Sequence, residues 1–487
     1  MNALALPVVL PLLAAFLVRP AGLASGSLAR WFGPLVLLLC AGMLVDTALL
    51  THGQPVSANI GGFAPPLGIV FYADSLALLF AIAVPAFALL LWPREAMQAG
   101  GDRISALMLL LVGSGTGMAL SGDLFNLYVF YELLAVASFG LVASSGSARA
   151  WAATVRYLLI SGFGSVLALV GVALIYAQTG TLNLAQLSEF APERLANPLG
   201  LAAFACLLIG FGVKAELFPV NAWVPEVYAT APKRVSALLA GVVSKLAILV
   251  VLRLILLVFD LPEARQSLLV LGLIGLVSGE LAAWRARDLP RMLAFSSIGQ
   301  LGLLFMAVSI PGVLGLIAAL AVALHHLLMK PALFLLAERW SGGLENLAGA
   351  GRKAPLAAGL FTLFALSLLG VPPLPGFWAK LVLLLGLGQQ DAVLAQAAIF
   401  GVLLMAVVEA HYLFRLVGLL YAKTAHGAPP HRMGDLAVAS LLGAILVASM
   451  PLLPALAQGL GWMAHQASDV AAYRAVTLGS TIPGVAP

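Results

Sequence analysis

The chain has 487 residues, of which 62% are hydrophobic and 9% are charged, and its formal net charge is +5. Roughly 25% of the residues of an average soluble domain are charged, so this composition excludes an ordinary soluble protein and predicts an integral membrane protein. The two cysteines, Cys40 and Cys206, lie far apart in apolar segments, which argues against a disulfide framework and against a metal site.

Runs of about 20 apolar residues predict fourteen membrane-spanning helices and therefore an all-α membrane fold. The first span begins near the N-terminus, which has neither a basic leader nor a small-residue cleavage site and is predicted to be retained. The predicted spans are 3–18, 31–50, 68–92, 104–120, 124–144, 151–178, 198–229, 235–258, 267–284, 290–310, 313–338, 354–388, 395–421 and 435–456.

The basic residues predict the orientation of these spans, because cytoplasmic connections carry an excess of Lys and Arg. Sixteen of the 25 basic residues fall in the odd-numbered connections or at the adjoining ends of the spans: Arg19, Arg30, Arg94, Arg103, Arg149, Arg156, Lys233, Arg234, Arg285, Arg287, Arg291, Arg339, Arg352, Lys353, Lys423 and Arg432. The even-numbered connections and the termini hold only Arg194, Arg265 and Arg474. Both termini are therefore predicted to lie on the outer side of the membrane.

Two predicted spans, 198–229 and 354–388, are too long for one straight crossing, and both contain clustered prolines. Proline removes a backbone donor and disrupts the preceding turn. The predicted helix breaks are at Pro219, Pro225, Pro372, Pro373 and Pro375. The alternative is that these prolines only kink packed helices.

Paired breaks in two halves of a chain are typical of inverted repeats with an ion path at their interface. The two broken spans are five spans apart, and an odd offset reverses orientation, so the pattern predicts two inverted five-helix repeats. The predicted regions are 1–103 (three helices), 104–260 (first repeat), 261–423 (second repeat) and 424–487 (last helix and tail).

Five charged residues are predicted to lie deep in the apolar spans, namely Glu132, Lys214, Lys245, Lys330 and Lys380. Each central charge costs about 2.5–3.5 kcal/mol on insertion scales, so such residues are candidates for function. We expect Glu132 and Lys214 to pair and Lys245 to exchange a proton with them. The structural alternative is a set of ion pairs that hold helices together.

Four weaker candidates extend this set: His325, His326, Glu409 and His411. Histidine titrates near neutral pH, but adjacent residues on a helix point about 100° apart, so at most one of His325 and His326 is expected to face a proton path. Glu409 and His411 could continue the relay or serve only as packing residues. Glu216 and Glu280 fall nearer a break or a helix end, and Glu216 could satisfy interrupted backbone instead.

The sequence contains no zinc, haem, Walker or iron–sulfur spacing. We therefore expect no cofactor, no metal site and no nucleic-acid partner, and whether the chain counts as an enzyme is left open.

Four segments together resemble the antiporter-like subunit family shared by Mrp-type multisubunit Na⁺/H⁺ antiporters, complex I and membrane-bound hydrogenases. They are "SGDLFNLYVFYELL", "VKAELFPVNAWVPEVYATAPKRVSALLAGVVSK", "DLPRMLAFSSIGQLG" and "SLLGVPPLPGFWAK". The chain looks most similar to the D subunit of the Mrp type, although Asn221 stands where many members carry a histidine.

The resemblance implies fourteen helices, two inverted repeats and a central hydrophilic axis. It also implies that Glu132, Lys214, Lys245, Lys330 and Lys380 carry protons, with a histidine beside Lys330. The implied partners are other membrane subunits, the lipid bilayer, H⁺, and Na⁺ or K⁺ as the open candidates for a coupling ion. The expected location is the bacterial cytoplasmic membrane.

Two functions therefore remain open, and they differ in what drives the chain. In the first, it translocates protons within a multisubunit cation/proton antiporter. In the second, it pumps protons as an arm of a redox enzyme such as complex I or a hydrogenase. A third reading is a purely structural subunit.

Overall fold

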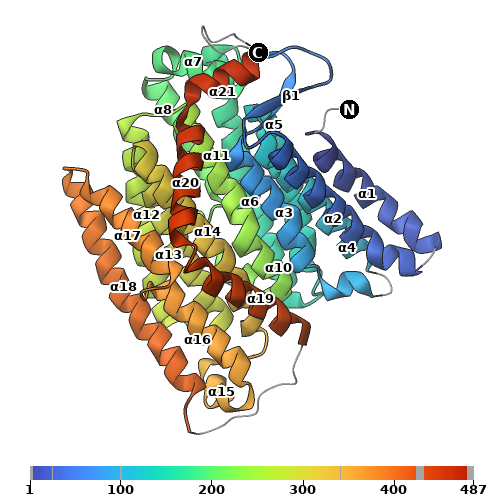
Figure 1. Ribbon diagram of the computed structural model, residues 1–487, viewed down its shortest axis with the longest axis vertical. Helices are drawn as coiled ribbons and strands as arrows, with labels where there is room; N and C mark the ends of the chain where they lie inside the picture. The colour runs from blue at the N-terminus through green and yellow to red at the C-terminus, as the bar shows by residue number, and fades with distance from the viewer. Residues whose placement is uncertain (1–3, 25, 99–100, 341, 424–432, 480–487) are drawn as a thin grey trace.

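The computed structural model describes residues 4–24, 26–98, 101–340, 342–423 and 433–479. Arg432, one of the basic residues predicted to face the cytoplasm, lies outside the described residues. Figure 1 shows a bundle of helices, most of which run roughly along its long axis.

The first half of the chain contains α1 (Leu6–Ala24), α2 (Gly26–Leu50), α3 (Ser75–Leu90), η1 (Arg94–Met97), α4 (Asp102–Leu120), α5 (Leu124–Ala143), α6 (Ala148–Thr179), α7 (Leu184–Arg194), α8 (Pro198–Gly212), α9 (Val224–Thr230), α10 (Lys233–Leu238), η2 (Leu239–Val243) and α11 (Ser244–Leu257). The second half contains α12 (Pro262–Arg285), α13 (Leu289–Ser309), α14 (Gly312–Ala337), η3 (Leu344–Leu347), α15 (Ala350–Lys353), α16 (Pro355–Leu369), α17 (Pro375–Gly388), α18 (Val393–Leu420), α19 (Met433–Ser449), α20 (Leu453–Ser468) and α21 (Val470–Leu478).

Ten helices of the described part of the chain are long and apolar enough to cross a membrane. The pair α19 and α20 gives an eleventh candidate if the two helices form one span, because they meet at a bend of 90°. Four shorter apolar helices, α3, α8, α16 and α17, have 14 to 16 residues each. Length and composition thus support ten or eleven spans, and fourteen remains a prediction.

The all-α prediction was wrong between residues 56 and 73, where the chain forms a two-stranded antiparallel sheet. Strand β1 (Val56–Ile60) pairs with β2 (Ile69–Ala73), and Val56 lies opposite Ala73. The sequence "IVFYA" of β2 is rich in the β-branched and aromatic residues that favour strands. Hydropathy alone cannot distinguish such a run from the start of a helix, so the predicted span 68–92 began too early.

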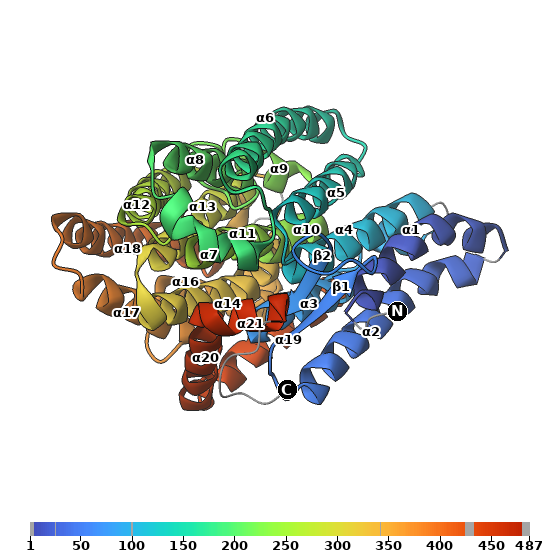
Figure 2. The same ribbon diagram turned by 90° about the horizontal axis from the view of Figure 1, so that it is seen from above.

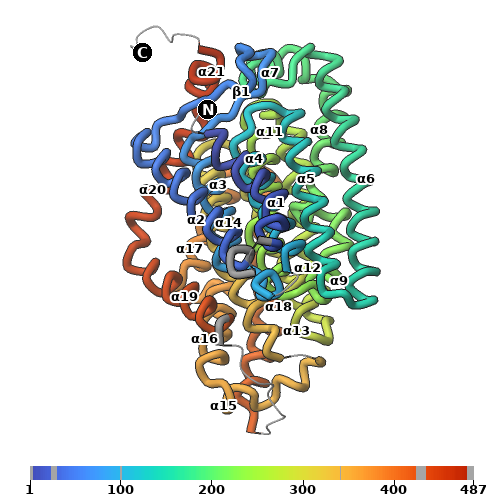
Figure 3. The backbone as a smooth tube through the Cα atoms, turned by 90° about the vertical axis from the view of Figure 1, so that its right-hand side faces the viewer, coloured from blue at the N-terminus to red at the C-terminus, as the bar shows by residue number. Residues whose placement is uncertain are grey.

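The C-terminal helices α19, α20 and α21 form a strap along one side of the bundle (Figures 1 and 3). At the α19 end, the Asp435 carboxylate accepts from Arg234 at 2.9 Å and lies 2.6 Å from Arg94. At the α21 end, the ring of Tyr473 packs on Tyr72, with centroids 4.1 Å apart. The predicted span 435–456 coincides with α19 and the start of α20, and the structure adds a bend of 90° between these helices and contacts to the bundle at both ends of the strap.

Small residues allow α12 and α13 to pack at close range. A Cβ atom added to Gly302 would lie 2.5 Å from the backbone O of Gly272 and 2.5 Å from the backbone N of Leu276. The hydrophobic effect does not drive helices together inside a lipid bilayer, so their association depends on close van der Waals packing. Small residues permit that packing because they let two backbones approach each other.

We expect Gly302→Ala to destabilise the protein by about 1–3 kcal/mol, because the new methyl group meets backbone atoms that cannot move aside. The measurement is the midpoint of unfolding by SDS in mixed micelles. Gly162→Ala on α6 is the control, because a Cβ atom there meets nothing within 4 Å and alanine is the better helix former. Equal midpoints for the two variants would contradict this account of the α12–α13 contact.

Candidate functional site

The first broken helix stops at Gly212 at the end of α8 and resumes at Val224 at the start of α9. Pro219 lies inside this interruption, whereas Pro225 lies in the first turn of α9, where its missing N–H would have no helical partner in any case. Such a break leaves backbone groups free at membrane depth, which is tolerated only inside protein or beside water. The two predicted breaking prolines therefore have different structural roles.

Lys214 lies in this interruption and is 1% exposed. Its ammonium group donates to Ser161 Oγ at 3.1 Å and lies 3.6 Å from the centre of the Tyr131 ring. Tyr131 is itself fixed, because its hydroxyl donates to the backbone O of Gly210 at 2.7 Å. A hydroxyl and an aromatic face therefore replace the water that a lysine normally requires.

Glu132 on α5 does not form the direct ion pair with Lys214 that the sequence predicted. Its side chain is half-buried, and its Oε1 atom is buried with no hydrogen-bond partner among the described residues. The two groups interact electrostatically at longer range. Glu132 and Lys214 therefore lie in one region, but the lysine nitrogen and the carboxylate oxygens do not come within 4.0 Å of each other.

Lys245 is fully buried and follows a distorted turn, the π-helical segment η2. Its ammonium group donates to the backbone O of Ala240 at 2.6 Å and to Ser244 Oγ at 3.1 Å, and it also contacts Nδ1 of His326. A π-turn shifts the backbone hydrogen bonds by one residue, and such turns occur often at functional sites. The Ala240 carbonyl becomes an acceptor for the lysine at the end of this turn.

Helix α14 carries His325, His326 and Lys330, and all three side chains are buried. His326 faces Lys245, while Nε2 of His325 lies 2.9 Å from Ser367 Oγ on α16. The two rings point to different partners, as expected for adjacent residues on a helix, and whether one or both face a proton path stays a prediction. Both are enclosed because α14 has other helices on several sides.

Lys330 lies about one turn further along α14 and is 0% exposed. Its ammonium group donates to Ser296 Oγ at 2.8 Å and to the backbone O of Leu293 at 3.1 Å, both on α13. Neutral acceptors therefore hold Lys330, and no carboxylate forms an ion pair with it within the described part of the chain.

The second broken helix stops at Leu369, turns at Gly370 with a φ of 88°, and resumes at Pro375. Pro372 and Pro373 lie in the interruption, and Pro375 is the first residue of α17. A Cβ atom on Gly376 would lie 1.8 Å from the backbone O of Ser367 and 2.8 Å from the His325 ring. Glycine at 376 therefore lets α17 begin directly against these two groups.

Lys380 on α17 forms the one ion pair among the predicted relay residues in the described chain. Its ammonium group lies 2.5 Å from Oε2 of Glu409 on α18 and donates to the backbone O of Leu369 at 3.1 Å. The other carboxylate oxygen of Glu409 accepts from Gln300 Nε2 at 2.9 Å. Both partners are largely buried, with side chains 13% and 3% exposed.

Two further carboxylates, Glu216 and Glu280, were not among the residues predicted to carry protons, and both are 1% exposed. Each has one oxygen bonded to a buried tyrosine hydroxyl: Tyr228 donates to Glu216 at 2.7 Å, and Tyr412 donates to Glu280 at 2.8 Å. The other oxygen of each has no partner among the described residues. Their positions near a break or a helix end did not predict burial. The signal that could have predicted it is a carboxylate within an apolar stretch.

His411 lies outside this buried set. Its side chain is exposed on α18, with its ring 6.1 Å from that of Trp284. Glu409 and His411 are two residues apart on one helix and therefore face in very different directions. The structure brings only Glu409 to Lys380.

We call the following buried or half-buried side chains the central polar row: Glu132, Lys214, Glu216, Lys245, His325, His326, Lys330, Lys380, Glu409 and Glu280. Seen from above in Figure 2, α5, α11, α14, α17 and α18 follow one another across the molecule, and α12, which carries Glu280, lies beside α18. Ionisable groups of this kind are rare at membrane depth unless they serve transport or pair with one another.

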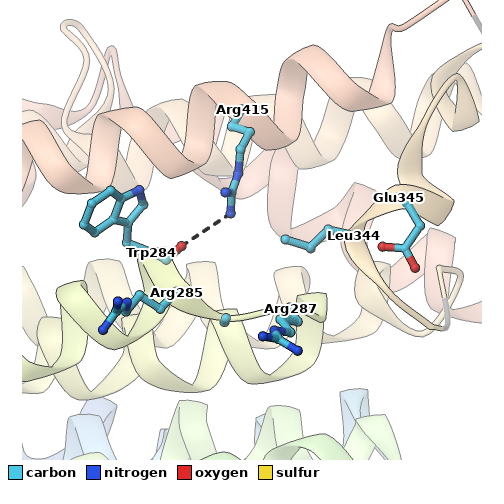
Figure 4. A pocket seen from close by; sticks show the side chains of 7 residues that line it. Trp284, Arg285, Arg287, Leu344, Glu345 and Arg415 are labelled. Atoms are coloured by element: carbon cyan, nitrogen blue, oxygen red, sulfur yellow. Dashed lines mark hydrogen bonds between the residues drawn. The ribbon is translucent and has the colours of Figure 1, made fainter.

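A surface cleft of about 540 Å³ lies elsewhere, at the end of α12 (Figure 4). It is lined by Trp284, Arg285, Arg287, Leu344, Glu345 and Arg415, and Arg415 reaches across to the Trp284 carbonyl at 3.5 Å. None of the central polar row lines this cleft. It is therefore separate from the candidate proton path.

Comparisons with known proteins show the family to which the chain belongs. The family model described as NADH:quinone oxidoreductase/Mrp antiporter, TM, matches residues 121–407. The N subunit of the NADH-quinone oxidoreductase of Desulforudis audaxviator (strain MP104C) is 34% identical over 433 residues, 85% of this chain and 86% of that protein. The D subunit of the Na⁺/H⁺ antiporter of Alkalihalophilus pseudofirmus (strain ATCC BAA-2126 / JCM 17055 / OF4) is 32% identical over 338 residues, 67% of this chain and 69% of that protein.

A solved structure of an archaeal respiratory membrane complex, the membrane-bound sulfane sulfur reductase, contains a chain of similar fold. The two chains superpose with a TM-score of 0.90 at 30% sequence identity, over 98% of this chain and 100% of that one. The fold of almost the whole chain is thus shared with a chain of a respiratory membrane complex.

Proposed function

We propose that this chain, which belongs to the NADH:quinone oxidoreductase/Mrp antiporter transmembrane family, is the proton-translocating subunit of a multisubunit cation/proton antiporter. The family resemblance predicted from the four sequence segments is confirmed by this match. The predicted partnership with other membrane subunits agrees with the assembly in which the similar solved chain is found. The observation that carries the proposal is the central polar row.

In this proposal the proton path has two halves that meet at α14. Glu132 and Lys214 serve the first half, with Lys245 and His326 at its inner end. Lys330 and His325 join it to the second half, where Lys380 and Glu409 form the last step. His411, exposed on the far face of α18, has no part in this path.

The Lys380–Glu409 ion pair must separate for a proton to pass, and this separation needs a source of free energy. Breaking a buried ion pair costs roughly 3–5 kcal/mol, whereas moving one charge through about 100 mV provides only about 2.3 kcal/mol. The membrane potential alone therefore does not open the pair. A second ion or a movement of a neighbouring subunit must contribute, which fits a chain that works inside a larger complex.

The topology that goes with this function has fourteen crossings. It adds to the ten long helices the bent pair α19 and α20, the short helix α3, and the two broken crossings α8–α9 and α16–α17. Residues 104–260 and 261–423 would form two inverted repeats, between the three-helix region 1–103 and the last region 424–487. Both termini would face the outer side of a bacterial cytoplasmic membrane. The odd spacing of the two breaks and the distribution of basic residues support this arrangement.

The second candidate function is a proton-pumping arm of a redox enzyme. One similar protein belongs to an NADH-quinone oxidoreductase, and the similar solved chain belongs to a respiratory complex. Purification in mild detergent, followed by identification of every co-purified protein, distinguishes the two functions. Small membrane subunits without flavin or iron–sulfur proteins support the antiporter, and redox subunits support the alternative.

Glu132→Gln and Lys214→Met are each expected to reduce Na⁺- or K⁺-dependent proton exchange about tenfold or more, because each removes a proton-carrying group while keeping the side chain's size. The assay is the collapse of an imposed pH gradient in membrane vesicles after addition of the cation. Glu189→Gln on α7 is the control, because it removes the same charge from an exposed site. Full exchange in both variants, with normal assembly, would leave a structural role as the better description.

A further inference from the structure

Glu216 has an unusual backbone conformation in the first broken helix. Its φ is 57°, in the left-handed region, and among the described non-glycine residues only His52 shares a positive φ. A residue with a Cβ atom pays a conformational free energy for a positive φ, which glycine does not. Such a conformation persists where the surrounding structure imposes it. The chain therefore uses glutamate at a position that glycine would fill more easily.

The carboxylate of Glu216 does not serve the interrupted backbone. Its Oε1 atom accepts the Tyr228 hydroxyl, and neither oxygen accepts a backbone N–H of the described residues. Pro219 and Asn221, which follow in the same break, are likewise not bonded by this carboxylate. The sequence-based alternative, in which Glu216 caps freed backbone groups, is therefore wrong.

The charges around Glu216 come from the helices that carry the rest of the central polar row. Its carboxylate interacts electrostatically with Lys245 on α11 and with Lys330 on α14. The phenols that interact with it are Tyr228 on α9 and Tyr157 on α6. Lys245 and Lys330 donate their hydrogen bonds to neutral groups. Lys330 also interacts electrostatically with Glu280 and Glu409 of the second half, whereas Glu216 is the carboxylate that acts on Lys245.

We propose that Glu216 is a proton-binding site of the path, which exchanges one proton with the Lys245 side and is positioned by Tyr228. In this step an N–H bond of the Lys245 ammonium breaks and an O–H bond of Glu216 forms, so that both charges are neutralised. The reverse step restores both charges and needs no oxidant or reductant. The inference rests on the proposed function and adds a carboxylate between the lysine of the first break and the lysines of the middle.

The same arrangement recurs in the second half, which argues against an accident of packing. Glu280 on α12 has one oxygen bonded to the Tyr412 hydroxyl, and its Oε1 has no partner in the described part of the chain. A Cβ atom on Gly299 would lie 2.3 Å from that oxygen, so glycine at 299 leaves the space that the carboxylate occupies. Each half thus contains a carboxylate held at one oxygen by tyrosine and open at the other.

The test uses the intact complex in vesicles and the variants Glu216→Gln, Glu216→Gly and Glu193→Gln. Glutamine keeps the shape and the acceptor for Tyr228 but cannot bind or release the proton, so exchange is expected to fall about tenfold or more. Glycine suits the left-handed backbone, so the complex should assemble at least as well and exchange should fall equally. Glu193→Gln, an exposed carboxylate on α7, should exchange normally.

Tyr228→Phe tests the positioning role by the pH dependence of exchange. A carboxylate that loses a donated hydrogen bond holds its proton more tightly, so the acidic limb of the pH profile is expected to move to higher pH. Tyr176→Phe, at an exposed tyrosine of α6, should leave the profile in place. If Glu216→Gln fails to assemble, an unchanged profile in Tyr228→Phe overturns the proposal.

The failure of this inference can be distinguished from the failure of the proposed function. If Glu216→Gln exchanges normally while Lys245→Met does not, Glu216 is no proton site and the proposed function stands. If both variants exchange normally, the proposed function falls together with the inference. If Glu216→Gly retains exchange, the carboxylate is dispensable and the inference is overturned.

Discussion

Lys245→Met is expected to lower cation-dependent proton exchange at least about 100-fold while the complex still assembles. Lys245 is fully buried between the Ala240 carbonyl, Ser244 and His326. Methionine has a similar length and no ionisable group, so it fills the space without carrying a proton. Lys245 forms no ion pair among the described residues, so its replacement does not leave a partner of an ion pair buried without its counter-charge.

The measurement is the rate at which vesicles that contain the intact complex collapse a pH gradient when Na⁺ or K⁺ is added. Co-purification of the partner proteins shows in parallel that the variant assembles. The matched control is Lys423→Met, which makes the same chemical change at an exposed lysine after α18. If Lys245→Met exchanged protons at the wild-type rate, Lys245 would not carry protons, and the proposed path would lack its central step.

Glu409→Ala is expected to destabilise the protein by about 3–5 kcal/mol and to abolish exchange, because it leaves a largely buried ammonium group without its counter-charge. The pair that it breaks joins Lys380 to Glu409 at 2.5 Å, and Gln300 loses its acceptor in the same step. The double variant Lys380→Met/Glu409→Leu removes both charges. It should recover most of the stability and none of the exchange.

Unfolding by SDS in mixed micelles gives the free-energy differences, and the vesicle assay gives the exchange rates. Asp260→Ala is the control, since it breaks the Arg265–Asp260 pair at 2.7 Å, in which Asp260 is 67% exposed. Such surface pairs contribute about 0–1 kcal/mol. If the double variant exchanged protons at the wild-type rate, the pair would be a structural contact and not a step of the path.

The two candidate functions share the expectation that these residues carry protons, because both move protons through the same chain. They differ in what supplies the energy, which is a property of the partner proteins. The relatives of this chain include both a member of an antiporter and a member of a respiratory enzyme. The identity of the co-purified proteins is therefore the observation that separates them.

The sequence by itself determined the properties that depend on local composition. The share of apolar residues predicted the membrane environment. The proline clusters predicted the two helix interruptions, which the structure places at 213–223 and 370–374. A charge in an apolar span is costly, and this cost alone makes Lys214, Lys245, Lys330 and Lys380 candidates for function. These inferences concern single segments, where hydropathy and backbone chemistry act over a few residues.

Only the tertiary structure decided which side chains meet. Contact of His326 with Lys245, pairing of Lys380 with Glu409 and exposure of His411 depend on how each helix is rotated against its neighbours. The partners are 29 to 81 residues apart along the chain. Helix rotation is set by the packing of whole faces, to which distant segments contribute equally, so no local pattern records it.

The same reason explains why local sequence predicts neither the burial of Glu216 and Glu280 nor the strand β2. A position near a break suggests exposure, yet neighbouring helices cover both carboxylates completely. The apolar run that begins at Ile69 suits a strand as well as a helix, and its pairing with Val56–Ile60 decides between them. The sequence thus determined what lies in the membrane, and the packing of the bundle decided which of its charges form one row.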